Sequence, residues 1–327
     1  ITVNPVNDAP SLLSNTASLT AISEDNTSAS GDTVTNLFGN NFSDATDQVT
    51  GGSSANSFAG IAISSYTADP SKGTWQYSSN GNSWNALSTI SSVTSSFTLK
   101  TTDYLRFVPA NNWNGSAPTL SVKLIDSSTS VTTAATVDAT GGATTAYSAN
   151  AVTLSHTVNP VNDAPVLDAA QSPALSSIIE DTAAPTNGSI ANSSLISSLV
   201  AGSSDIDANP LQGIAITAVN TANGALWYST DAGTTWTAVG SVSNTSALLL
   251  ASDNNTRLAF VPAANFNGTI NDVLTFRAWD QTSGSAGTKV DTSTNGSTSA
   301  FSTTTDTVAI TVNPVNDAPS LLSNTAS

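Results

Sequence analysis

A repeat constrains this chain more than any other feature of its sequence. The first eighteen residues, ITVNPVNDAPSLLSNTAS, return as the last eighteen, 309 positions further on. The middle of the chain carries TVNPVNDAP again, at 157–165. Other motifs return in the same order, so the sequence predicts one fold present twice within a longer array. We expect a first module at 9–163 and a second at 164–317, with 1–8 ending a preceding module and 318–327 starting the next.

Short apolar stretches of both copies alternate with a period of two, which is typical of strands with one buried face. Clusters of Ser, Thr, Asn and Gly separate these stretches, as turns do between short strands. The alternating sets are Ile61/Ile63, Leu105/Phe107, Leu120/Val122/Leu124, Ile214/Ile216, Leu258/Phe260, Leu274/Phe276 and Val308/Ile310/Val312. We therefore predict an all-β chain of antiparallel sandwiches with little or no α-helix, the one candidate being 194–200.

Composition excludes several classes of function. The chain has 23 acidic against 7 basic residues and a net charge of −16, so nucleic acids and anionic lipids are poor partners. It contains no Cys, which excludes thiol chemistry and favours a secreted, extracellular protein. The single histidine, His156, falls where the other copies have Ile1 and Ile310, so we expect a strand position. Neither a nucleophile–histidine pair nor a membrane-spanning stretch is present, and we expect no enzyme and no membrane insertion.

Acidic and amide side chains recur at matching positions of the two copies. Each copy has an early Glu, an acidic loop, a strand that ends in Asp, and the closing motif VNDAP. The motif FVPA-x-N-[WF]-NG lies between the loop and the strand-ending Asp. Within NPVNDAP, Pro160 ends strand pairing and Ala164-Pro165 favours extended backbone, so we predict a short, stiff linker.

This order of parts resembles cadherin-like modules, above all those repeated in very large bacterial surface adhesins exported by type I secretion. The resemblance implies two tandem Greek-key sandwiches of the cadherin/Ig type, joined end to end by short linkers, with Ca²⁺ at each junction. Oxygen ligands of these types suit calcium, which takes six to eight of them in flexible geometry. In the family, the early Glu belongs to the module before a junction, and the acidic loop and strand-ending Asp belong to the module after it.

Transferred to this chain, the resemblance implies ligands at three junctions. The N-terminal junction would use Asn7, Asp8, Asp44, Asp47 and Asp126. The central junction would use Glu24, Asn162, Asp163, Asp205, Asp207 and Asp280. The C-terminal junction would use Glu180, Asn316 and Asp317. The chain departs from the cadherin pattern in its linker, where Pro160 replaces the first Asp and one residue is missing. For a further acidic position of that pattern, only Asp103 and Asp253 are candidates. We therefore expect one or two ions per junction.

The stretch YSTDAGTTW at 228–236 fits the Asp-box pattern S-x-D-x-G-x-T-W, and the first copy has a shorter form with Asn80 in place of the Asp. The pattern predicts a β-hairpin in which Asp231 accepts from turn N–H groups, Gly233 takes positive φ and Trp236 packs on the sheet. We expect Trp84 and Trp236 in the core, and regard Trp75, Trp227 and Trp279 as the tryptophans available to stack on a sugar.

Two functions fit these features. The first is a non-catalytic extender of a repetitive surface adhesin, in which junction calcium stiffens the array and neighbouring repeats are the partners, while other domains bind cell-surface or matrix glycans and proteins. The second is a repeated lectin-like or protein-binding module, in which copy number supplies avidity.

Overall fold

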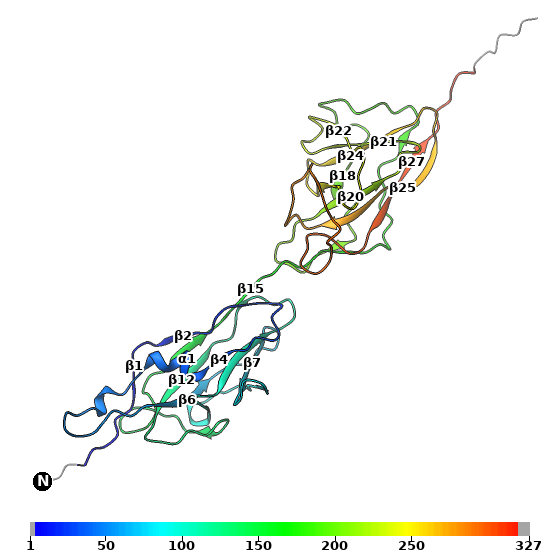
Figure 1. Cartoon of the computed structure of the whole chain (residues 1–327). Coiled ribbons are helices and arrows are strands. Elements are labelled where there is room, and N and C mark those ends of the chain that lie inside the picture. Colours follow the sequence, from blue (N-terminus) through cyan, green and yellow to red (C-terminus); the bar gives the residue numbers. More distant parts are fainter. Residues whose placement is uncertain (1–3, 320–327) are drawn as a thin grey trace, which may run out of the picture. The chain divides into compact units, whose positions relative to one another are not determined.

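The computed structural model describes residues 4–319 and divides into two compact units, Ile1–Val161 (unit 1) and Asn162–Ser327 (unit 2). Both consist mainly of short strands, which confirms the prediction of an all-β chain (Figure 1). Of the predicted flanking segments, residues 1–3 and 320–327 lie outside the described part.

The strands of unit 1 form two main sheets within the described residues. The larger sheet has the order β13 (Thr136–Val137), β9 (Ser96–Lys100), β6 (Phe58–Ser65), β12 (Leu120–Asp126), β14 (Val152–Ser155), β2 (Thr16–Ser18). The second has the order β4 (Asp32–Thr33), β10 (Tyr104–Pro109), β7 (Gly73–Ser78), β8 (Asn85–Ala86). Smaller pairings join β11 (Gly115–Ser116), β15 (Thr157–Asn159) and β3 (Ile22–Ser23), and also β1 (Ser11–Leu12) and β5 (Phe42–Ser43).

Unit 2 repeats this plan with longer strands. Its larger sheet has the order β17 (Ile178–Ile179), β27 (Asp306–Asn313), β25 (Gly268–Trp279), β20 (Gly213–Val219), β23 (Ala247–Ala251), β26 (Lys289–Val290). The second sheet has the order β18 (Ser193–Leu195), β24 (Arg257–Pro262), β21 (Gly224–Ser229), β22 (Thr237–Ala238), and β16 (Val166–Leu167) pairs with β19 (Ser203–Ser204).

Each unit buries its own apolar core, and the alternating residues supply much of it. In unit 1, Ile61, Leu105 and Phe107 have no exposed surface, and in unit 2 the same holds for Ile216 and Phe276. The prediction from period-two patterning is confirmed for these residues, although parts of the opposite face are covered as well, as the buried Ala62 and Ala215 show.

In each unit, strands that follow the first short one lie beside the last strands and run parallel to them. In unit 1, β2 pairs with β14, and β3 pairs with β15 through Val158↔Ile22 and Asn159↔Ser23. In unit 2, β17 pairs with β27 through Ile178↔Val312 and Ile179↔Asn313. The chain therefore enters one end of each unit and leaves at the other, along neighbouring strands.

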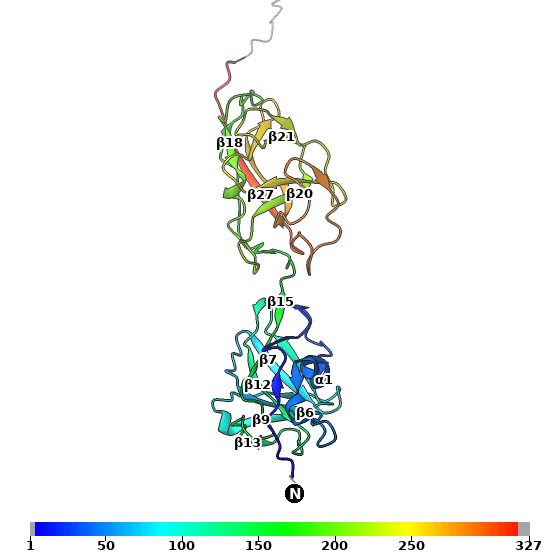
Figure 2. The same cartoon turned by 90° about the vertical axis from the view of Figure 1, so that its left-hand side faces the viewer.

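Within residues 4–319 helix is confined to short pieces, as predicted, but the candidate segment 194–200 is not an α-helix. Residues 194–200 form the end of β18 and a 3₁₀ turn, Ile196–Ser198, so the helix prediction there was wrong. The α-helix of the described residues is α1 (Val34–Phe38) in unit 1, beside its strands (Figure 2). Thr33 caps it by accepting from the Asn36 N–H at 3.2 Å, and Val34, Leu37 and Phe38 bury one face. Three more 3₁₀ turns lie at Gly39–Asn41, Ala45–Asp47 and Val93–Ser95.

Candidate functional site

In unit 1, the predicted ligands of the N-terminal junction form one hydrogen-bonded group, Asn7, Asp8, Asp44, Asp47 and Asp126 (the unit 1 cluster). Asn7 donates its Nδ2 to Asp126 Oδ2 at 3.3 Å, and the Asp8 N–H donates to Asp47 Oδ1 at 2.9 Å. Asp126 ends β12, and Asp47 ends a 3₁₀ turn, so three distant parts of the chain meet here.

Asp44 shows that this cluster concentrates negative charge in a place with little water. Its side chain is 4% exposed, and its Oδ1 is buried with no hydrogen-bond partner. Burial raises the pKa of Asp44, and the neighbouring carboxylates of Asp47 and Asp126 raise it further. An unpaired buried carboxylate oxygen next to two others is costly unless a proton or a cation neutralises it.

Unit 2 contains an equivalent group, Asn162, Asp163, Asp205, Asp207 and Asp280 (the unit 2 cluster). Asn162 Nδ2 donates to Asp280 Oδ2 at 2.9 Å, and the Asp163 N–H donates to Asp207 Oδ2 at 3.0 Å. These two bonds match the Asn7–Asp126 and Asp8–Asp47 bonds of unit 1. Burial raises the pKa of Asp205, with added repulsion from Asp207 and Asp280, and its Oδ2 is buried without a hydrogen-bond partner.

Sequence reasoning missed two contributors to these clusters. In unit 1, Asn56 donates its Nδ2 to Asn7 Oδ1 at 2.8 Å and to Asp47 Oδ2 at 2.9 Å, and its N–H donates to Asp44 Oδ2 at 2.6 Å. In both units a hydroxyl two residues after the strand-ending Asp donates to that Asp, Ser128 to Asp126 and Thr282 to Asp280. The spacing D-x-[ST] is visible in both copies, but it is too common to have marked a site.

The two clusters offer the oxygen ligands that a hard cation prefers, although amide and backbone N–H groups donate hydrogen bonds to several of these oxygens. Among the described residues, no three His, Cys, Asp or Glu side chains form a group placed to hold a metal ion. The donors present are carboxylate and amide oxygens, the ligands that Ca²⁺ takes, and each cluster has a buried carboxylate oxygen without a partner. A cavity of about 250 Å³ adjoins the unit 1 cluster, lined in part by Asn7, Asp47 and Asn56.

The two early glutamates lie elsewhere, where the chain leaves each unit. Glu24 is 2% exposed, and its carboxylate accepts from the Val161 N–H at 2.6 Å and from Asn114 Nδ2 at 2.9 Å. Glu24 and these partners belong to unit 1, whereas the other predicted ligands of the central junction belong to unit 2.

Glu180 of unit 2 makes the same contacts. Its carboxylate accepts from the Val315 N–H at 2.6 Å and from Asn267 Nδ2 at 2.8 Å. These bonds lower the pKa of Glu180, the Val315 N–H having the larger effect. The remaining predicted ligands at this end, Asn316 and Asp317, are exposed, and Asn316 Nδ2 donates to the Asp317 carbonyl at 3.3 Å.

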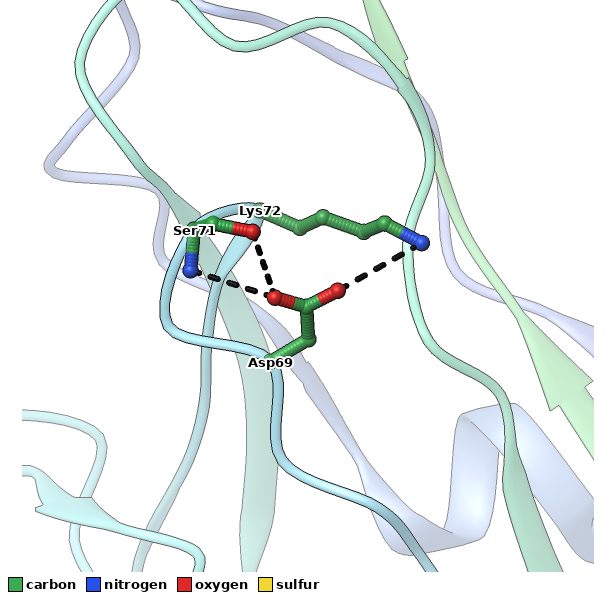
Figure 3. Close-up of polar contacts among 3 residues, drawn as sticks. All are labelled: Asp69, Ser71 and Lys72. Carbon is green, nitrogen blue, oxygen red and sulfur yellow. Dashed lines mark hydrogen bonds and ion pairs between the residues drawn. The ribbon is translucent and has the colours of Figure 1, made fainter.

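Basic side chains do not neutralise the clusters. The ion pair found within residues 4–319 joins Lys72 Nζ to Asp69 Oδ2 at 3.5 Å, in an exposed turn where Ser71 also donates to Asp69 (Figure 3). The Ser71 hydroxyl contributes most to lowering the pKa of Asp69. The pair is exposed and local to its turn, so solvent screens it and it has no part in the clusters.

The Asp-box stretch forms the predicted hairpin, in which β21 pairs with β22. Asp231 Oδ1 accepts from the Thr235 N–H at 2.9 Å, and Gly233 has a φ of 81°. Trp236 is 8% exposed and donates Nε1 to the Ser189 carbonyl at 2.9 Å, which confirms its place in the core.

The other tryptophan predictions need correction. Trp75 and Trp279 are buried, at 0% and 2% exposure, so neither can stack on a sugar. Trp84, predicted in the core, is half-buried, with the Arg106 guanidinium carbon 4.1 Å from its ring centroid. Of the three tryptophans considered for sugar stacking, Trp227 alone is half-exposed.

His156 lies between β14 and β15 rather than inside a strand, so the strand assignment was one residue off. Its ring is 3% exposed and packs against Trp75 and Phe107, with centroid distances of 6.0 and 5.7 Å. Burial lowers the pKa of His156, which fits a neutral side chain in an aromatic core.

Compared with protein-family models the chain matches none, and a search of curated proteins returns no match. No helix within residues 4–319 is long and apolar enough to cross a membrane.

Proposed function

We propose that each unit is a cadherin-like Greek-key sandwich that binds Ca²⁺ at its acidic cluster, and that the chain is an extender segment of a repetitive bacterial surface adhesin. The single observation that carries the calcium assignment is the pair of matching clusters. Both combine a buried strand-ending Asp, an Asp of raised pKa and a buried carboxylate oxygen without a hydrogen-bond partner, while no basic side chain pairs with them among the described residues.

The recurrence of the clusters favours a structural cation over catalytic carboxylates. The same residue types, Asn and Asp from the linker and Asp at the end of a long strand, meet in each unit with the same hydrogen bonds. Calcium would bridge the linker residues to the body of the unit and remove the repulsion between carboxylates. A linker fixed in this way would stiffen a string of modules and hold a distal binding domain away from a cell.

Small-angle scattering on the whole chain tests this function. With millimolar calcium we expect a larger maximum dimension than with EDTA, because fixed linkers restrict the motion of one unit against the other. Magnesium should produce little of this change, since it demands tight octahedral geometry and keeps its waters. Superimposable profiles with calcium and with EDTA would contradict the stiffening role.

A localised variant sharpens the same experiment. Asp163→Ala removes one linker carboxylate of the unit 2 cluster. We expect it to abolish most of the calcium-dependent change in scattering while circular dichroism stays that of a folded chain. Asp25→Ala is the matched control, because Asp25 is exposed and outside both clusters.

A further inference from the structure

The early glutamates occupy the same place in both units, and their contacts need no cation. In unit 1, the Glu24 N–H donates to the Asn159 carbonyl at 3.0 Å, which continues the parallel pairing of β3 with β15. The carboxylate then reaches past Pro160, which has no N–H to offer, and accepts from Val161. Glu24 therefore holds the exit strand both before and after the proline.

The second Asn of FVPA-x-N-[WF]-NG completes this arrangement. Asn114 directly precedes β11, and β11 and β3 flank β15 on its two sides. The Glu24 carboxylate thus spans the end of the exit strand, with one oxygen on Val161 and the other on Asn114. We call this set of contacts the exit latch.

Unit 2 has its own exit latch at the end of β27. The Glu180 N–H donates to the Asn313 carbonyl at 3.0 Å, and its carboxylate bridges Val315 and Asn267. The corresponding bond lengths of the two latches agree within 0.1 Å, being 2.6 and 2.6 Å to the linker N–H and 2.9 and 2.8 Å to the Asn amide.

The position of the latch determines which load it carries. Tension between the two ends of a unit pulls β2 and β3, or β17 in unit 2, against the last strands in opposite directions along their length, because these strands are neighbours and parallel. Bonds spaced along such a pair are loaded together rather than one after another. The latch adds two hydrogen bonds to a charged acceptor at the very end of the pair, and such bonds are stronger than neutral ones.

We propose that the exit latches, Glu24–Asn114 and Glu180–Asn267, make each unit load-bearing, so that the module resists unfolding when the chain is pulled from its ends. This function goes beyond calcium binding, since all its bonds lie within one unit and every donor is a protein N–H group. It also assigns a role to the FVPA-x-N-[WF]-NG motif, whose second Asn is the amide donor.

Exchanging the two latch side chains provides a sharp test. Asn114→Asp sets two carboxylates against each other, and Glu24→Gln replaces the charged acceptor with a neutral amide. The double variant, Glu24→Gln with Asn114→Asp, restores one donor and one acceptor with the same net charge. Its Gln oxygen accepts from Val161 and its Gln amide donates to the new carboxylate. Asp25→Asn is the control, because Asp25 is adjacent to Glu24 but exposed.

The measurement is the unfolding rate of the full chain, held at constant force between its two ends in EGTA, with unit 2 as the internal reference. We expect each single variant to speed unfolding of unit 1 about tenfold or more, because forced unfolding follows the unfolding rate and a charge-assisted bond is lost. The double variant should return to within about threefold of the wild type. The reciprocal set, Glu180→Gln with Asn267→Asp, should act on unit 2 alone.

The outcomes separate this proposal from calcium binding. If single variants unfold under force as slowly as the wild type, or if the double variant stays as fast as the singles, the load-bearing latch is wrong. Should a single variant fail to fold, the double variant decides alone, because recovery of slow unfolding supports the latch and fast unfolding overturns it. A calcium-insensitive chain with intact latch behaviour would instead contradict the proposed function and leave the latch standing.

Discussion

The acidic clusters and the exit latches both contain carboxylates, but the pKa values of these carboxylates shift in opposite directions. At the clusters, carboxylates crowd together, and burial and repulsion raise the pKa values of Asp44 and Asp205. At the unit 2 latch, a single carboxylate receives two donors, and the pKa of Glu180 is lowered. In unit 2, burial and repulsion therefore disfavour the carboxylate at the end where the chain enters, and hydrogen bonds favour the carboxylate at the end where it leaves. This difference is what we expect if the clusters bind a cation, as proposed, while the latch carboxylates bind protein donors.

The largest effect should come from breaking a latch. Glu24→Ala leaves the Val161 N–H and the Asn114 amide without their acceptor, so we expect unit 1 to lose about 2–4 kcal/mol of unfolding free energy. Denaturant unfolding in EDTA measures this loss. Asp25→Ala should stay within about 0.5 kcal/mol of the wild type. Equal losses in the two variants would mean that the latch contributes nothing beyond a surface charge.

Calcium should produce the next largest effect, and at the clusters only. At 10 to 100 times its dissociation constant, one bound ion adds about 1.4–2.7 kcal/mol by mass action. Asp207→Asn keeps an oxygen for the Asp163 N–H but removes a charge, so it should fold normally in EDTA and lose most of the gain in unit 2. Calorimetric titration and thermal melts with and without calcium measure both quantities. If calcium stabilised unit 2 of Asp207→Asn as much as unit 2 of the wild type, the unit 2 cluster would not be the binding site.

A smaller effect of opposite sign should follow neutralisation of Asp44. Asp44→Asn relieves repulsion from Asp47 and Asp126 in a buried place, so in EDTA it should stabilise unit 1, by less than calcium stabilises the wild type. The same change should weaken calcium binding. Thermal melts of the variant in EDTA and in calcium measure both changes. A variant less stable than the wild type in EDTA would contradict the destabilising repulsion that we assign to the unit 1 cluster.

The dependence of stability on pH should differ in sign within unit 2, and this is the smallest of the effects. The pKa of Asp205 is raised above its ordinary value of 3.8, so its contribution to stability is present below pH 3.8 and is lost as pH rises through the folded pKa. The pKa of Glu180 is lowered below 4.5, so its contribution is present above pH 4.5 and is lost as pH falls through the folded pKa. Unfolding curves of Asp205→Asn and Glu180→Gln in EDTA, from pH 3 to 7, should deviate from the wild type in opposite directions.

Much of the fold was visible in the sequence because alternation by two is a local signal. Ile61 and Ile63 lie on the buried face of β6, as their spacing predicts, and the Asp-box residues fix their own turn. The short helix α1 was not predicted, because five residues are too few to show a helical period. Its N-cap, Thr33, could not be told from the many threonines of the loops.

Site residues could be predicted from the sequence where they belong to a repeated motif. They could not be predicted where a contact depends on a residue far away in the sequence. Linker Asn and Asp residues and strand-ending Asp residues recur in both copies, and the structure brings them together. Glu24 and Asn114 stand 90 positions apart, and only the pairing of β15 with both β3 and β11 makes them partners. Trp75 and Trp279 were misjudged for the same reason, because burial of an aromatic ring depends on the sheet that covers it.

One bond of the latch also determines when a unit can finish folding. Glu24 and Val161 are separated by 137 positions, and Glu180 and Val315 by 135. A chain delivered end-first, from a ribosome or through a pore, cannot close either latch until nearly the whole module and the proline after it have emerged. Each module therefore completes itself with residues of the segment that leads to the next.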